Sequence, residues 1–125
     1  NRINKIKRQA IIEFNKMSLD DMRKALRLYG YKGESMSTEL VESKLFEIVE
    51  TDPNRFFSVW VNNKTRNTQF LIEAAIAKNV IRKSRNIYYY GTDIIGNSLE
   101  DAIAHLDDKG NQDLKLTILQ ETESK

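Results

Sequence analysis

The chain has 125 residues, of which 40% are apolar and 30% charged, and a formal net charge of +2 at pH 7. This length supports one small domain, or a domain with a helical annex, and the apolar content is enough for a core. The absence of cysteine excludes disulfides, thiolate metal sites and a cysteine nucleophile. No apolar run approaches the roughly 20 residues that cross a bilayer, and no signal peptide is visible, so we expect no membrane partner and no secretion.

The small net charge hides a strong partition along the sequence. Residues 1–16 hold five Lys or Arg against one Glu, residues 62–85 hold six against one, and residues 98–125 hold seven acids against three bases. This pattern indicates either a side that faces a polyanion or pairing between basic and acidic parts, within the molecule or between subunits. Ordinary solvated helix faces are a third interpretation.

The first half of the chain predicts helices only. Residues 2–15 place apolar side chains at helical spacing, and residues 17–50 predict two short helices joined by a glycine-containing extension. Ser18 with Asp21 is a helix-start signal, Gly30 and Gly33 end that helix, and Ser37 opens the next one.

A fourth helix is predicted over residues 52–62, because Asp52 is a good cap and Pro53 is favoured in a first turn. It carries the densest aromatic cluster of the chain, which we expect in the core. The cluster consists of Phe56, Phe57 and Trp60.

The next segment predicts a buried helix followed by a hairpin. Residues 65–78 form the helix, with Asn79 as its left-handed C-cap. Val80-Ile81 and Ile87–Tyr90 flank RKSRN, which predicts a β-hairpin with a basic tip. The helices 52–62 and 65–78 with this hairpin have the order of a winged-helix unit, although Glu73 on the exposed stripe of the second helix opposes reading of the major groove.

The C-terminal part predicts a turn and two helices. Gly91 and Gly96 bound the turn, and Ser98 with Asp101 opens a helix. The stretch 114–120 alternates like a strand but also fits a helix, and Asn111 as a cap favours the helix. We therefore predict a mainly α-helical fold with a helix-extension-helix segment and one β-hairpin, winged-helix-like, insert. The expected division is 1–51 and 52–125, packed as one unit.

The segment 17–50 resembles the helix-extension-helix modules of the SAP and LEM type. The resemblance rests on Leu19, Met22, Leu26, Gly30-Tyr31, Leu40 and Leu45. SAP-type members bind DNA and LEM-type members bind proteins, so the resemblance implies a binding role. Where the DNA-binding branch commonly carries a base, this chain has Ser37-Thr38-Glu39.

Residues 70–120 resemble segments of uncharacterised tailed-bacteriophage proteins. The matching features are KNVIRKSRNIYYYG, IIGNSLEDAIAHL and NQDLKL. This resemblance implies a virion component or a DNA-associated factor, located in the virion or the host cytoplasm.

Catalytic and metal-binding motifs are absent from the sequence. There is no phosphate-binding glycine loop, HExxH motif, nucleophile elbow or EF-hand spacing. His105 is the only histidine, with Asp101 and Asp108 as its expected neighbours on one helix. A small hydrolase would have to rely on His105 and Asp108, so we expect no enzyme, no cofactor and no metal.

The favoured hypothesis is a non-enzymatic, phage-type module that binds the nucleic-acid backbone without sequence preference. Ten basic residues are the candidate contacts: Lys5, Lys7, Arg8, Arg23, Lys24, Arg27, Lys32, Arg82, Lys83 and Arg85. The alternative is a structural or adaptor protein of a virion assembly, which includes a homo-oligomer, whose basic N-terminal helix and acidic C-terminal segment meet neighbouring subunits.

Overall fold

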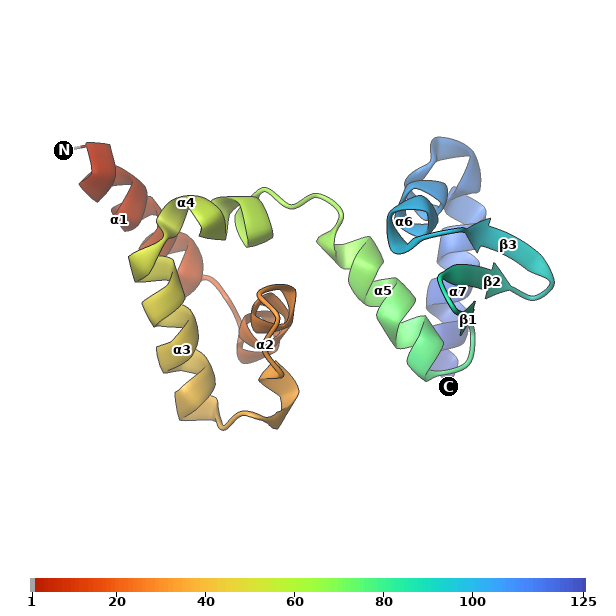
Figure 1. The fold of residues 1–125 in the computed structure, drawn as a ribbon, viewed down its shortest axis with the longest axis horizontal. Helices are drawn as coiled ribbons and strands as arrows, with labels where there is room; N and C mark the ends of the chain where they lie inside the picture. Colours follow the sequence, from red (N-terminus) through yellow and green to blue (C-terminus); the bar gives the residue numbers. More distant parts are fainter. Residues whose placement is uncertain (1) are drawn as a thin grey trace. The chain divides into compact units, whose positions relative to one another are not determined.

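A computed structural model describes residues 2–125 of the chain, with the side chains of the first helix described from Lys5 onward. The fold is mainly helical with one small antiparallel sheet, as predicted (Figure 1). It consists of two compact units, residues 1–63 and 64–125, which we describe separately. Within the described residues, no helix is both long and apolar enough to cross a membrane.

The N-terminal unit contains four helices and two short irregular turns of helix. The elements are α1 (Arg2–Asn15), α2 (Leu19–Leu28), the 3-10 turn η1 (Gly33–Ser35), α3 (Thr38–Thr51), α4 (Pro53–Phe56) and the π-helical turn η2 (Phe57–Val61). Helix α3 packs against α1, α2 and α4. The buried apolar side chains of this unit are Ala10, Phe14, Met17, Ala25, Leu26, Val41, Leu45, Val49, Phe56 and Trp60.

Side-chain caps set the helix boundaries of this unit. Ser18 and Asp21 form the predicted capping box, in which the Ser18 hydroxyl accepts from the Asp21 N–H at 3.0 Å. The Ser37 hydroxyl accepts from the Leu40 N–H at 3.2 Å. Asp52 caps α4 through the N–H of Arg55 at 3.1 Å. These short-range signals confirm the predicted helix starts.

The division of the chain differs from the predicted one. The sequence predicts a boundary after residue 51, but α4 packs against α1 and α3, and η2 packs against α2, so residues 53–61 belong with the N-terminal unit. The aromatic side chains explain this assignment, because Phe56 is fully buried and Trp60 is 7% exposed. The three elements expected to form a winged helix are therefore divided between the two units.

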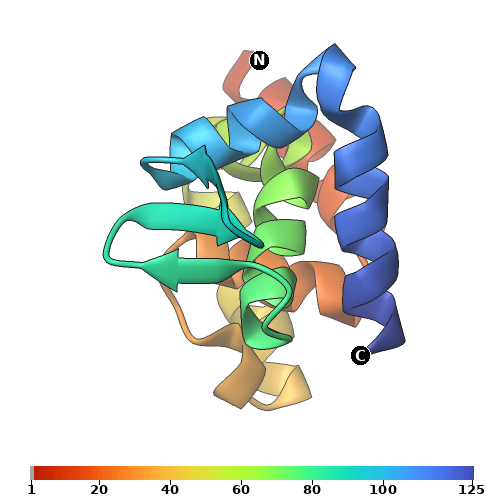
Figure 2. The same ribbon diagram turned by 90° about the vertical axis from the view of Figure 1, so that its right-hand side faces the viewer.

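The C-terminal unit contains three helices, a short 3-10 turn and three strands. The elements are α5 (Arg66–Ala77), β1 (Arg82–Ser84), β2 (Ile87–Tyr90), β3 (Asp93–Gly96), α6 (Leu99–Asp107), the 3-10 turn η3 (Lys109–Asn111) and α7 (Gln112–Ser124). The strands lie side by side in the order β1-β2-β3, all antiparallel (Figure 2). The core of this unit consists of Ile72, Ala75, Val80, Ile81, Tyr88, Ile95, Ala102, Ile103, Leu106 and Ile118.

Two predicted features of this unit need correction. The residues expected at the hairpin tip, Arg82 and Lys83, form β1 itself, while Val80 and Ile81 precede the strand and are buried. The segment 93–96, for which the sequence predicts a turn, is a third strand paired with β2. Gly96 permits this packing, because a Cβ there would lie only 2.4 Å from the Ala102 nitrogen.

Two asparagines were predicted to cap helices, Asn79 at the end of α5 and Asn111 at the start of α7, and the structure confirms only the first. Asn79 follows α5 with a φ of +62°, which is the predicted left-handed conformation. Residues 112–124 form a helix as predicted, but Asn111 makes no side-chain cap. Its amide instead donates to the His105 carbonyl at 2.9 Å.

Candidate nucleic-acid interface

The first group of predicted cations lies on α1. Lys5 and Arg8 are exposed, and no ion pair is formed by either among the described side chains. Lys7 is partly buried, and its Nζ lies 3.9 Å from a carboxylate oxygen of Glu50 on α3. Two of the three basic residues therefore point their charge to solvent.

Arg23 holds the extension of the helix-extension-helix segment in place. One Nη of its guanidinium donates to the carbonyls of Gly33 at 2.5 Å and Met36 at 2.7 Å. Gly33 is buried against the same residue, and a Cβ there would lie 2.6 Å from the Arg23 carbonyl oxygen. The charge of Arg23 is thus directed at the protein's own backbone.

The remaining bases of this segment are also largely occupied. Lys24 pairs with Asp20 at 3.0 Å one turn earlier on α2, and Arg27 forms an ion pair with Glu34 of η1. Lys32 is exposed. The sequence shows the one-turn spacing of Asp20 and Lys24, but it gives no sign that carbonyls lie opposite Arg23 and a carboxylate opposite Arg27.

The second group of cations lies on the hairpin of the C-terminal unit. Arg82 pairs with Tyr89 across β1 and β2, and its guanidinium lies over the tyrosine ring, 4.1 Å from the centroid. Lys83 pairs with Tyr88, with its Nζ 5.6 Å from that ring centroid. Arg85 forms the tip, where it is exposed with a φ of +58°. None of the three cations forms an ion pair within the described part of the chain.

The tyrosines of β2 are divided between the two faces of the sheet. Tyr88 is 5% exposed and belongs to the core, and the Tyr90 hydroxyl donates to Glu121 of α7 at 2.7 Å. This hydrogen bond raises the pKa of Tyr90, because it favours the protonated phenol next to a carboxylate. Of these three tyrosines only Tyr89 is on the outer face, so a single tyrosine ring is available there for stacking.

The outer face of the sheet carries a row of three side chains, one per strand. Arg82 pairs with Tyr89, and Tyr89 pairs with Ile94, so the three project on the same side. Ile94 is 54% exposed, the largest exposed fraction among the large apolar residues described. We call Arg82, Tyr89 and Ile94 the outer row.

The only histidine lies beside a shallow depression of about 420 Å³ in the same unit. His105, Asp101 and Asp108 all line it, together with Ile94 and Gly96. Among the described residues no group of acids and histidine is placed to hold a metal ion.

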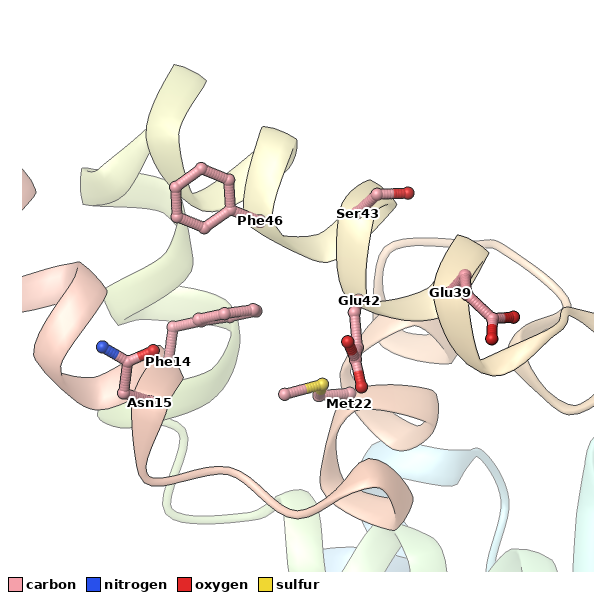
Figure 3. Close-up of a pocket in the computed structure, with 7 residues that line it drawn as sticks. All are labelled: Phe14, Asn15, Met22, Glu39, Glu42, Ser43 and Phe46. Atoms are coloured by element: carbon pink, nitrogen blue, oxygen red, sulfur yellow. The ribbon is translucent and has the colours of Figure 1, made fainter.

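A groove in the N-terminal unit was not predicted. It has a volume of about 560 Å³ and lies between α1, α2 and α3 (Figure 3). Phe14, Met22 and Phe46 supply its apolar surface, and Glu39 and Glu42 lie along α3 at one end. The only signal in the sequence is the position of Phe46, which α3 places one to two turns after the two glutamates and which is 38% exposed. We call these five residues, with Asn15 and Ser43, the α1–α3 groove.

Comparisons with known proteins add no identification. No protein-family model matches the chain, and neither does any curated protein or solved structure compared with it.

Proposed function

We propose that the chain is a non-enzymatic module that binds the phosphate backbone of nucleic acid, without sequence preference, through the hairpin of the C-terminal unit. The observation that supports this proposal is the placement of Arg82, Lys83 and Arg85 on one exposed strand and turn, free of ion pairs in the described residues. Phosphate contacts need such available cations, because binding gains free energy from the release of condensed counterions.

The outer row adds a second type of contact. Guanidinium planes and aromatic rings both stack on unpaired bases, and Arg82 already lies over Tyr89. Single strands expose their bases, whereas a duplex does not. The module is therefore expected to bind single-stranded DNA or RNA at least as well as duplex.

The number of available cations sets the expected salt dependence. Three phosphate contacts give a slope of log K against log salt of about −2.7 on duplex and about −2.1 on single strands. Adding Lys5 and Arg8 of α1 would bring the duplex slope to about −4.5. Fluorescence anisotropy of labelled single- and double-stranded oligonucleotides across a salt series measures this directly.

A matched pair of triple variants tests the site itself. Arg82→Gln, Lys83→Gln and Arg85→Gln together should weaken binding at low salt by about tenfold or more, since each phosphate contact contributes separately. The control changes three exposed lysines of the same unit outside the hairpin, Lys64, Lys78 and Lys109, to Gln. Equal losses in both variants, salt-insensitive binding, or no binding at low salt would refute the proposal.

The second candidate function is a structural or adaptor role in a virion-type assembly. It is favoured by the α1–α3 groove, whose apolar walls and two glutamates suit a protein surface and repel phosphate. Charge reversal at Lys5, Lys7 and Arg8 with size measurement separates the two. An assembly that dissociates in a protein for which no nucleic-acid binding is detected, with or without the charge reversal, favours the adaptor.

A further inference from the structure

The sheet of the C-terminal unit has an open edge at β3. This strand pairs only with β2, and α6 packs beside it (Figure 2). Within the described residues, the backbone groups of Asp93–Gly96 form no hydrogen bond outside the sheet. Alternate residues of an edge strand direct their N–H and C=O groups away from the sheet, so β3 can accept one more strand.

The opposite edge of the sheet, β1, is protected against such pairing. It has three residues, all exposed, and two of them are Arg82 and Lys83. A short edge strand with exposed cations resists pairing with another strand. By contrast, β3 carries no basic residue, and its Ile94 is 54% exposed. Of the two edges, β3 is therefore the better surface for an added strand.

The shallow depression of about 420 Å³ runs along this open edge. Residues Ile94–Asn97 form one wall, and α6 forms the other with Asp101, Ala104, His105 and Asp108. The four residues of the second wall recur at helical spacing, so they share one face of the helix. A strand added to β3 would lie in this depression with α6 beside it. We call it the β3–α6 groove.

The charge of the β3–α6 groove determines the chemistry of its occupant. The lining contains two carboxylates, Asp101 and Asp108, and no lysine or arginine. Both carboxylates are exposed, and neither forms an ion pair among the described side chains. Such a groove repels phosphate and attracts a partner with positive charge.

The spacing of the two carboxylates suits an extended chain. Asp108 follows Asp101 by seven residues, which is about 10 Å of helix. Side chains on one face of a strand recur about every 7 Å. Two flexible basic side chains at alternate positions of an added strand can therefore reach both carboxylates. The ladder of backbone hydrogen bonds would hold the strand itself on β3.

We propose that the β3–α6 groove binds an extended segment of another protein, with lysine or arginine at alternate positions, as an added strand on β3. The backbone ladder supplies affinity, and the two carboxylates select the basic side chains. A second copy of this chain fits less well. Pairing β3 with β3 would bring the acidic side chains of both grooves together, and β1 is protected by its own cations.

Amide chemical shifts of the full chain, titrated with a short synthetic peptide of alternating lysine and valine, test the proposal. The largest shifts should fall on residues 93–97 and on the groove face of α6, with a dissociation constant of about 1 mM or tighter. A peptide of alternating glutamate and valine should cause no such shifts, because it carries the charge of the groove.

Two N-methylated forms of the lysine peptide test the backbone ladder. One is methylated at the valine nitrogens and the other at the lysine nitrogens. Only alternate N–H groups of an added strand point at β3, so one form should lose binding and the other should keep it.

Paired variants test the charge of the groove. Asp101→Asn with Asp108→Asn should weaken binding of the lysine peptide at least about threefold, since exposed charge pairs contribute modestly. The asparagine at 108 keeps an oxygen for the Gly110 N–H, and circular dichroism checks that each variant folds. The control, Glu73→Gln with Glu123→Gln, changes two exposed acids of the same unit outside the groove and should bind like wild type.

The test is independent of nucleic-acid binding. The hairpin cations do not line the groove, so the triple glutamine variant of the hairpin should bind the lysine peptide no more weakly than wild type. The proposal would be overturned by an absence of shifts in the groove at about 1 mM peptide, by equal binding of the glutamate peptide, by equal effects of the two methylations, or by an equal loss in the control variant. Shifts of residues 93–97 that depend on protein concentration alone would identify a second copy as the occupant and would also overturn it.

Discussion

Replacing Arg23 by Met separates a structural role of this residue from a ligand-binding one. The methionine retains an apolar stem of similar reach but loses both hydrogen bonds to the Gly33 and Met36 carbonyls. A hydrogen bond from a charged donor contributes about 1.5–3 kcal/mol, and the half-buried position of Arg23 lowers this value. We therefore expect a loss of about 2–4 kcal/mol in the free energy of unfolding of the N-terminal unit.

Urea unfolding followed by the fluorescence of Trp60 measures this loss. Trp60 is the only tryptophan of the chain and lies in the N-terminal unit. A unit of this size has a total stability of only about 3–9 kcal/mol. With an m-value near 1 kcal/mol/M, the midpoint should fall by about 2 M or more.

The control is Lys24→Met, which removes only the exposed pair with Asp20. Such a pair one turn apart contributes at most about 0.5 kcal/mol. Nucleic-acid binding of folded Arg23→Met should match that of wild type. A variant that unfolds within about 0.5 kcal/mol of wild type but binds DNA more weakly would refute the structural assignment.

Three further predictions concern packing and protonation. Gly96→Ala should destabilise the C-terminal unit by about 1–3 kcal/mol in thermal unfolding, because its Cβ would lie 2.4 Å from the Ala102 nitrogen, whereas wild-type stability would contradict that close approach. Burial raises the pKa of Tyr29 to about 12, despite the nearby Arg55, and its buried hydroxyl has no hydrogen-bond partner among the described residues. Tyr29→Phe should therefore lower the free energy of unfolding by less than about 0.5 kcal/mol at neutral pH. In an ultraviolet titration of the folded protein, the variant should lack the tyrosine that ionises at the highest pH. The contribution of Tyr29 to the free energy of unfolding is fully present below the unfolded pKa of 10 and is lost as the pH rises toward about 12. The Tyr29→Phe variant should not show this loss of stability. Burial would raise the pKa of Asp107, but hydrogen bonds from Lys115 and Thr68 hold it below its ordinary value. Its stabilisation is present above the unfolded pKa of 3.8 and is lost as pH falls through the lower folded pKa. Asp107→Asn should therefore cost about 1 kcal/mol at pH 7 in urea unfolding, and progressively less as the pH falls below 3.8.

Local sequence signals predicted the helices well because their causes are local. Ser18, Ser37 and Ser98 each bond an N–H three residues later, so the cap and its partner are visible together in the sequence. Asn79 adopts the left-handed conformation for an equally local reason.

Features that depend on distant residues were missed. Strand β3 exists because residues 93–96 pair with β2 and because Gly96 allows α6 to approach, neither of which a short window displays. The division after residue 63 depends on where Phe56 is buried. The α1–α3 groove joins residues from three helices for the same reason.

The sequence predicts the candidate site as ten basic residues. In the structure some of these side chains contact carbonyls or carboxylates of the protein, and others do not. Arg23 meets carbonyls ten and thirteen residues away, and Arg27 meets a carboxylate seven residues away. Arg82, by comparison, meets a tyrosine ring, which leaves its charge uncompensated. Ten phosphate contacts would give a duplex salt slope of about −9, whereas the hairpin alone gives about −2.7. The measured slope therefore tests the geometry of the charges and not only their number. A value near −9 would mean that the internal contacts of Arg23, Lys24 and Arg27 open when nucleic acid binds.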